Sequence, residues 1–91
     1  MFNNKEIKKM KTNKIVYIVN GSEDGVLGVY GNVKGAYKTA TDYVLNGCGD
    51  TIELNKKSYS KVCKELKRYF SSNVANDDIC SASIDCYYFN Q

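Results

Sequence analysis

The chain has 91 residues, of which 43% are hydrophobic and 25% are charged, and this composition is typical of one small globular domain. It contains neither histidine nor tryptophan, so the side chain that most often titrates near neutral pH and most often ligates transition metals is missing. The longest apolar run, residues 15–19, is far shorter than the roughly 20 residues that a membrane-spanning helix needs, which argues against a membrane protein.

The net charge of +3 is unevenly distributed along the chain. Residues 1–13 carry four lysines and one glutamate and therefore account for the whole net charge. Residues 56–70 carry six basic side chains against one glutamate, and the rest of the chain is acidic on balance. The folded part is thus a charge dipole, which favours an oriented contact with a protein over indiscriminate binding to a polyanion.

The chain divides into a flexible basic tail, residues 1–13, and a single domain, residues 14–91, because the first segment has too few apolar residues to bury a face. Residues 14–20 are β-branched and apolar on both alternating faces, which predicts a buried strand inside a sheet. Glycine-containing turn dipeptides then lead into residues 26–31, and this pattern predicts a β-hairpin. Gly28 within the second strand predicts a bulge or the close approach of another group.

Two amphipathic helices follow the hairpin. Apolar residues recur at helical spacing over 33–44, with Asn32 as the expected N-cap and Asn46-Gly47 as the expected end. A second apolar stripe covers 59–70, with Asn55 as the expected N-cap and lysines on the solvent-facing side. The regular spacing of this second stripe is the strongest structural signal in the chain.

The other segments complete the predicted sheet. Residues 51–54 predict a short strand, residues 71–78 a polar connection and residues 81–90 the last strand. The order ββαβαβ predicts an α+β domain with a small, mostly antiparallel sheet and two helices on one face. The other face of such a sheet stays bare, and we expect it to be apolar and rich in tyrosine.

The four cysteines show no metal-binding pattern. Cys48, Cys63, Cys80 and Cys86 include no Cys-x-x-Cys pair, which argues against a zinc site. Cys63 and Cys86 fall at core-facing positions and are expected to be small buried residues. Since no export signal precedes the domain, we expect four free thiols, and we expect no metal and no cofactor.

Catalytic chemistry has little support in the residues present. A cysteine nucleophile needs a base to form its thiolate, and the usual imidazole base is missing. The closest acidic pairs, Glu23-Asp24 and Asp77-Asp78, lie in loop segments, where short polar side chains normally stabilise turns. We therefore expect a non-enzymatic protein.

Residues 14–44, KIVYIVNGSEDGVLGVYGNVKGAYKTATDYV, resemble a short module of small proteins from phages and prophages. Proteins of this kind include inhibitors of host defence such as anti-CRISPR proteins, which occupy a surface of a nuclease complex. The resemblance implies a phage-encoded inhibitor that acts in the host cytoplasm on a CRISPR-Cas-type complex. It contains no catalytic motif.

These observations predict an inhibitor or adaptor that docks on a larger host protein or nucleoprotein complex and does not contact a membrane. The expected contact residues are exposed acidic, basic and aromatic side chains of the hairpin, the second helix and the last strand: Glu23, Asp24, Tyr30, Lys61, Lys64, Arg68, Tyr87 and Phe89. The acidic side chains could imitate nucleic-acid phosphates, whereas the lysines could instead bind an acidic partner.

Two other modes of binding stay open. A small nucleic-acid-binding regulator would use the basic tail and the lysine-rich second helix, with aromatic rings of the last strand stacked on bases. The eight acidic residues of the folded part outside residues 56–70, and its single arginine, weigh against it. A homodimer would join two copies through their last strands.

Overall fold

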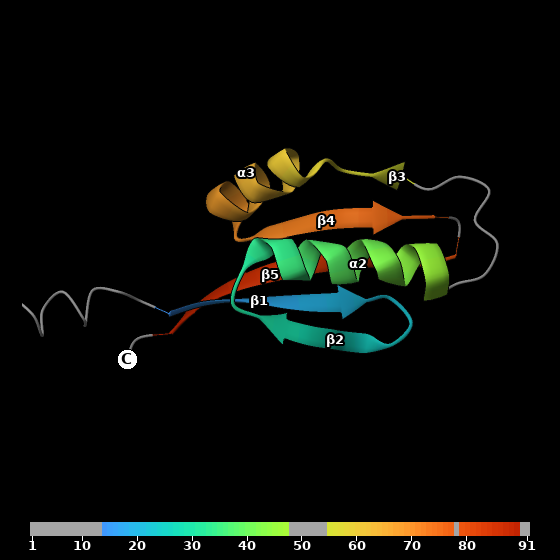
Figure 1. The fold of residues 1–91 in the computed structure, drawn as a ribbon, viewed down its shortest axis with the longest axis horizontal. Coiled ribbons are helices and arrows are strands. Elements are labelled where there is room, and N and C mark those ends of the chain that lie inside the picture. The colour runs from blue at the N-terminus through green and yellow to red at the C-terminus, as the bar shows by residue number, and fades with distance from the viewer. Residues whose placement is uncertain (1–13, 48–54, 78, 90–91) are drawn as a thin grey trace, which may run out of the picture.

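The computed structural model describes residues 14–47, 55–77 and 79–89. They form an antiparallel five-stranded sheet with two helices packed on it (Figure 1), which confirms the predicted α+β fold class. The elements are β1 (Lys14–Gly21), β2 (Gly25–Tyr30), α2 (Val33–Gly47), β3 (Asn55–Lys56), α3 (Tyr59–Tyr69), β4 (Ser71–Asn76) and β5 (Ser81–Phe89). Neither helix in the described ranges combines the length and the apolar character that crossing a bilayer requires.

The strand order is β2-β1-β5-β4-β3, so the last strand of the chain lies at the centre of the sheet. β5 pairs with β1 along its whole length, from Phe89 opposite Lys14 to Ala82 opposite Gly21, and β4 pairs with its other side. β1 is an interior strand, as predicted. A dimer joined through the last strand would need a free edge on that strand, and over residues 81–85 both edges of β5 are occupied.

β1 and β2 form the predicted hairpin. Gly25 closes its turn with a φ of 74°, a conformation that glycine adopts without steric cost. A register shift leaves Leu27 as a bulge without a partner on β1. A Cβ atom at Gly28 would lie 2.9 Å from the Tyr30 ring. Both predicted reasons for a glycine in this strand, a bulge and a close approach, are confirmed.

α2 starts and ends where the sequence predicts. Asn32 caps its first turn, since Asn32 Oδ1 accepts a hydrogen bond of 2.8 Å from a backbone amide of that turn. Ala36, Ala40 and Val44 form the face that packs on the sheet, and all three are fully buried. Their small side chains allow the helix to lie close to β1 and β5 (Figure 1), and it ends at Gly47.

α3 occupies the predicted segment, but Ser58 rather than Asn55 is its N-cap. Ser58 Oγ accepts a hydrogen bond of 3.2 Å from the Lys61 amide. Asn55 belongs to β3 and pairs with β4. Serine and asparagine are equally good caps, so the choice depends on this non-local strand pairing and not on local preference. The strand predicted over residues 51–54 lies outside the described residues.

Residues 71–76 form a strand, so the predicted polar connection over 71–78 is wrong. Ser72 and Val74 are buried while Ser71 and Asn73 are exposed, which is the alternation of a strand with one buried face. The polar residue at a buried position conceals this pattern in the sequence. Ser72 is buried because its hydroxyl has a partner on α3 that only the folded chain provides.

Asp77 has the turn-forming role that the sequence predicts for it. Its Oδ1 atom accepts hydrogen bonds from the amides of Ile79 and Cys80, at 2.8 Å and 2.7 Å. These bonds form the tight connection from β4 to β5. Asp78, the second acid of this pair, lies outside the described residues.

The core lies between the two helices and one face of the sheet. Its largest fully buried side chains are Val19, Val44, Val62, Val74 and Ile84. The strand residues that alternate with the core residues form the bare face. Among the described residues its apolar members are Val16, Ile18, Val26, Val29 and Tyr87, and its polar members include Asn20, Ser83 and Asp85. One half of this face is therefore apolar, as expected. The expected richness in tyrosine is wrong for the described residues, since Tyr87 is the one tyrosine among them on this face.

Candidate interaction surface

The end of α3 and the end of β5 bring three aromatic and two basic side chains together on the surface. We call this set the aromatic–basic patch: Lys67, Arg68, Tyr69, Phe70 and Tyr88. All five are exposed, and the exposed fractions of the three rings lie between 49% and 63%. Several large rings exposed side by side are unusual on a protein without a partner, and such patches mark interaction sites.

Phe70 is held in a backbone conformation that phenylalanine rarely adopts. Its φ of 61° is left-handed, and no other non-glycine residue of the described part has a positive φ. Its amide donates to the Leu66 carbonyl at 3.0 Å, and its own carbonyl accepts from the Cys86 amide at 2.8 Å. Glycine or asparagine usually ends a helix in this way. The chain thus keeps an exposed ring at a position where glycine would avoid the backbone strain.

The Phe70 ring contacts the Tyr88 ring and joins the two halves of the patch. Their centroids are 5.6 Å apart and the ring planes meet at 76°, an edge-to-face arrangement. Tyr88 faces the helix side of the sheet because it alternates with Cys86 and the core residue Ile84 along β5. The contact therefore fixes both rings without burying either of them.

Arg68 and Tyr69 form the outer part of the patch. The Arg68 guanidinium lies 5.5 Å from the centroid of the Tyr69 ring, within the range of a cation–π interaction. Both side chains remain open to solvent. A planar cation stacked on an exposed ring is already ordered, so a partner that binds it loses less conformational entropy.

Glu65 is the single carboxylate of α3, and other side chains already engage it. Lys57 Nζ lies 2.7 Å from Glu65 Oε1, and the Ser72 hydroxyl donates to the same atom at 2.9 Å. The hydrogen bond from Lys57 and then that from Ser72 lower the pKa of Glu65. This carboxylate therefore stays ionised and neutralises Lys57.

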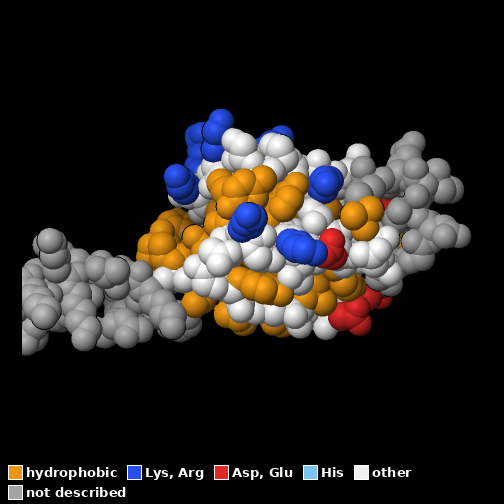
Figure 2. All heavy atoms as spheres, in the orientation of Figure 1, with side chains coloured by type: hydrophobic (Ala, Val, Ile, Leu, Met, Phe, Trp, Pro, Cys, Tyr) orange, Lys and Arg blue, Asp and Glu red, His pale blue; other side chains and the backbone are white. Residues whose placement is uncertain are grey.

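The basic side chains of α3 have no carboxylate partner among the described residues. Lys61, Lys64, Lys67 and Arg68 are exposed, and none forms an ion pair with a described residue. Figure 2 shows basic side chains gathered over α3, with hydrophobic side chains between and below them. This side of the molecule has a positive potential that attracts an acidic partner.

The acidic side chains of the hairpin lie far from this positive surface. Glu23 and Asp24 are exposed in the turn between β1 and β2, where the Glu23 amide donates to the Tyr43 hydroxyl at 3.1 Å. Figure 2 shows acidic side chains near this turn, at the end of the molecule opposite the basic cluster. The predicted acidic and basic contact residues therefore do not belong to one surface.

Three predicted aromatic contact residues also fall outside the patch. The Tyr30 hydroxyl is hydrogen-bonded to Thr39 Oγ1, and the ring packs close to Gly28 and Gly35, so the domain itself engages this side chain. Tyr87 is half exposed but points to the bare face of the sheet. Phe89 pairs with Lys14 at the end of β5, and the position of its side chain is outside the described part of the structure.

Four residues of the patch were not among the predicted contact residues: Lys67, Tyr69, Phe70 and Tyr88. Tyr69 and Phe70 looked like the last core positions of the apolar stripe, since they continue its helical spacing. The helix ends at Tyr69 and the chain turns at once into β4, so these two rings are left at the surface. No signal in the sequence marks their exposure, because the strand that follows the helix is itself concealed by its polar residues.

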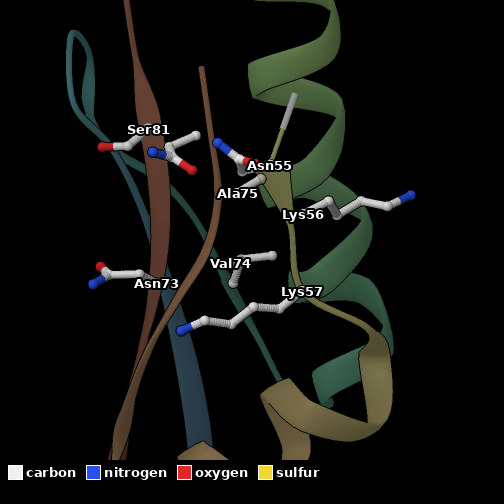
Figure 3. Close-up of a pocket in the computed structure, with 8 residues that line it drawn as sticks. Asn55, Lys56, Lys57, Asn73, Val74, Ala75 and Ser81 are labelled. Carbon is white, nitrogen blue, oxygen red and sulfur yellow. The ribbon is translucent and has the colours of Figure 1, made fainter. Parts of the chain in front are cut away.

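A depression in the surface lies along the pairing of β3 with β4, away from the aromatic–basic patch, and has a volume of about 600 Å³. Figure 3 shows Asn55 and Ala75 close together, with Val74 further along β4, while the long side chain of Lys56 points away. The charged residues that line the depression are Lys56 and Lys57. It is a wide opening that brings no acid and base together, and it offers no catalytic arrangement.

The cysteines differ from the prediction. Cys80 is disulfide-bonded, whereas Cys63 and Cys86 are free thiols. Four free thiols is therefore wrong, because spatial distance and not sequence spacing decides which cysteines bond. Cys63 and Cys86 are half-buried rather than buried, and burial raises the pKa of the Cys86 thiol. No group of three or more Cys, Asp and Glu side chains in the described ranges could hold a metal ion.

Comparison with known proteins adds no family to these observations. No protein-family model matches the chain, and neither a curated protein nor a solved structure gives a significant match.

Proposed function

We propose that this chain is a small non-enzymatic binding protein that docks on a larger acidic protein through the aromatic–basic patch and acts as an inhibitor or adaptor. The observation that supports this best is Phe70, an exposed ring kept in a left-handed backbone conformation beside Tyr88. Strained backbone is retained where function needs the side chain it presents.

The composition of the patch fits a protein contact. Tyrosine and arginine are the residues most enriched among those that dominate binding energies, and the patch holds two tyrosines and an arginine. The neighbouring Lys61 and Lys64 extend the positive surface along α3. An acidic partner would gain both charge attraction and aromatic burial there.

The origin and the target belong to the same proposal and rest on the resemblance of residues 14–44. A phage-encoded inhibitor of a host defence nuclease complex would act in the host cytoplasm. The disulfide at Cys80 weighs against this location, since reducing conditions there keep most thiols free. Rapid alkylation of thiols in intact host cells, followed by mass spectrometry, decides whether Cys80 is oxidised where the protein acts.

Affinity capture with matched charge variants tests the protein partner. Arg68→Glu reverses a charge within the patch, and Lys56→Glu makes the same change on β3, away from the patch. We expect the wild-type chain and Lys56→Glu to retain the same host protein after nuclease treatment, and Arg68→Glu to lose it. Equal retention by all three chains would rule out the patch as the docking surface.

Single-stranded nucleic acid is the second candidate, and the exposed rings beside unpaired lysines support it. Each of the bases can stack on an aromatic side chain, so such binding tolerates any nucleic-acid sequence, and lysines neutralise the phosphates. The basic residues 1–13 precede β1, which pairs with the end of β5 beside Tyr88. A nucleic acid on the patch would therefore lie close to the point where these residues join the domain.

Salt dependence separates the two candidates. A fluorescent oligothymidylate is titrated with the chain between 50 mM and 200 mM salt. Binding of a single strand through the four exposed basic side chains of α3 would weaken by roughly fiftyfold over this range, and by more if residues 1–13 also contact phosphates. Submicromolar binding with such a slope would favour the nucleic-acid function, and failure to bind at 50 mM salt would leave the protein partner as the proposal.

A further inference from the structure

A small apolar cleft opens between α2 and α3, next to the aromatic–basic patch. Its floor is formed by Tyr17 and Cys86, which face each other across β1 and β5. Its walls come from α3 and from the start of α2, and the lining residues are Tyr17, Val33, Cys63, Leu66, Lys67 and Cys86. Its volume is about 140 Å³. An apolar cavity of roughly this size holds a group as large as benzene.

The lining of the cleft selects for an apolar group with negative charge nearby. No carboxylate lines it, and the ammonium group of Lys67 is its single charge. Burial raises the pKa values of Tyr17 and Cys86, so both groups are neutral at physiological pH. Lys67 also belongs to the patch, so the cleft and the positive surface are continuous. In Figure 2 hydrophobic side chains between α3 and α2 are surrounded by basic ones.

We propose that this cleft receives one leucine-sized or phenyl-sized side chain from an acidic segment of the protein partner, with the acidic neighbours of that side chain lying on the aromatic–basic patch. This inference rests on the proposed protein-binding function. Charge complementarity favours an acidic segment. A nucleobase fits less well, because its donors and acceptors would be buried against a lining that offers few polar partners.

Two synthetic peptides test the cleft directly. One has a central leucine flanked by two acidic residues on each side, and the other has alanine in place of the leucine. Fluorescence anisotropy with the full chain measures both dissociation constants. The lost methyl groups should weaken binding about tenfold. Equal dissociation constants for the two peptides, or binding of neither, would overturn the proposal.

Cys63→Phe, which fills the cleft, and Ser60→Phe, which adds the same ring at an exposed position of α3 outside the lining, form a matched pair. We expect Cys63→Phe to remove the preference for leucine while the weaker, charge-driven binding of the alanine peptide remains. Ser60→Phe should keep the preference. A leucine preference that survives in a folded Cys63→Phe chain would show that the side chain binds elsewhere and would overturn the proposal.

Thiol protection in the wild-type chain provides a readout that does not depend on any variant folding. Saturating leucine peptide should slow the alkylation of Cys63 and Cys86 at least about fivefold, since both thiols line the cleft. Unchanged alkylation rates at saturation would contradict the proposal.

The failure of this inference differs from the failure of the proposed function. If Arg68→Glu weakens the binding of both peptides and leucine gives no advantage, the patch is the docking surface and the cleft is not used. If oligothymidylate binds and displaces both peptides, the protein-binding function itself is wrong.

Discussion

Phe70 combines an unfavourable backbone conformation with a favourable ring contact, and two substitutions separate these effects. Phe70→Gly removes both the left-handed strain, about 1 kcal/mol, and the contact with Tyr88, which is of similar size. Phe70→Ala loses the contact and keeps the strain. We expect Phe70→Gly to unfold with nearly wild-type free energy, and Phe70→Ala to be less stable than Phe70→Gly by about 1 kcal/mol in urea denaturation.

Binding should respond differently from stability at this position. Both Phe70 variants lose the ring, so both should bind the partner more weakly than the wild-type chain, although one of them folds as well. If the two variants were equally stable, the left-handed conformation would not be the cause of the difference. If both bound normally, Phe70 would be a structural residue alone.

Because of Glu65, we expect the free energy of unfolding of the domain to fall at acidic pH. Its hydrogen bonds with Lys57 and Ser72 lower its pKa below the ordinary value of 4.5. The stabilisation that it contributes is therefore complete above pH 4.5 and is lost as the pH falls through the lowered value. We expect Glu65→Gln to be less stable than the wild-type chain at pH 6, with the difference shrinking below pH 4.5.

The Lys38–Asp42 pair on α2 provides the control for this measurement. Its Lys38 and Asp42 side chains are 78% and 46% exposed, against 29% and 22% for Lys57 and Glu65. Exposed pairs of this kind contribute little because water screens them. A pH-dependent loss as large in Asp42→Asn as in Glu65→Gln would mean that the partly buried contacts of Glu65 have no special role.

Substitutions on the buried and on the exposed face of β4 test whether this segment is a strand. Val74 is fully buried against the helices and Asn73 is exposed on the other face. Val74→Ala should lower the free energy of unfolding by about 2 kcal/mol. Asn73→Ala should change it by less than about 0.5 kcal/mol. Thermal or urea denaturation measures both, and similar small effects would indicate that this segment is a loop.

The helices and the first hairpin were predictable because each depends on nearby residues. Asn32 caps α2 within one turn, and the apolar stripe of α3 repeats over three turns. β4 was not predictable, since Ser72 occupies a buried position whose hydrogen-bond partner comes from a helix. The predicted N-cap of α3 was wrong because of a non-local contact as well, since the pairing of β3 with β4 keeps Asn55 in a strand.

The candidate surface was predictable only in part. Lys61, Lys64 and Arg68 follow from the periodicity of α3, which assigns them to the solvent-facing side. The neighbourhood of Phe70 and Tyr88 does not, because it depends on β5 lying at the centre of the sheet beside the end of α3. The wide separation of the acidic hairpin turn from α3 also comes from the strand order.

The disulfide at Cys80 predicts fewer than four free thiols per chain, although the sequence alone suggested four. A thiol-reactive dye added to the denatured, unreduced protein should label fewer than four cysteines, and all four after reduction. Reduction should also lower the stability of the domain by about 2–4 kcal/mol, because the cross-link restricts the unfolded chain. Four labelled cysteines without reductant would contradict the disulfide.

The pairing of Lys14 with Phe89 has a practical consequence for work with this protein. The described chain enters and leaves the sheet at the same end, within reach of Tyr88. An affinity tag, a fluorescent protein or a resin fused directly before Lys14 or directly after Phe89 would therefore hinder access to the aromatic–basic patch. A reporter introduced at the solvent-exposed turn around Gly25, on the far side, would leave it open.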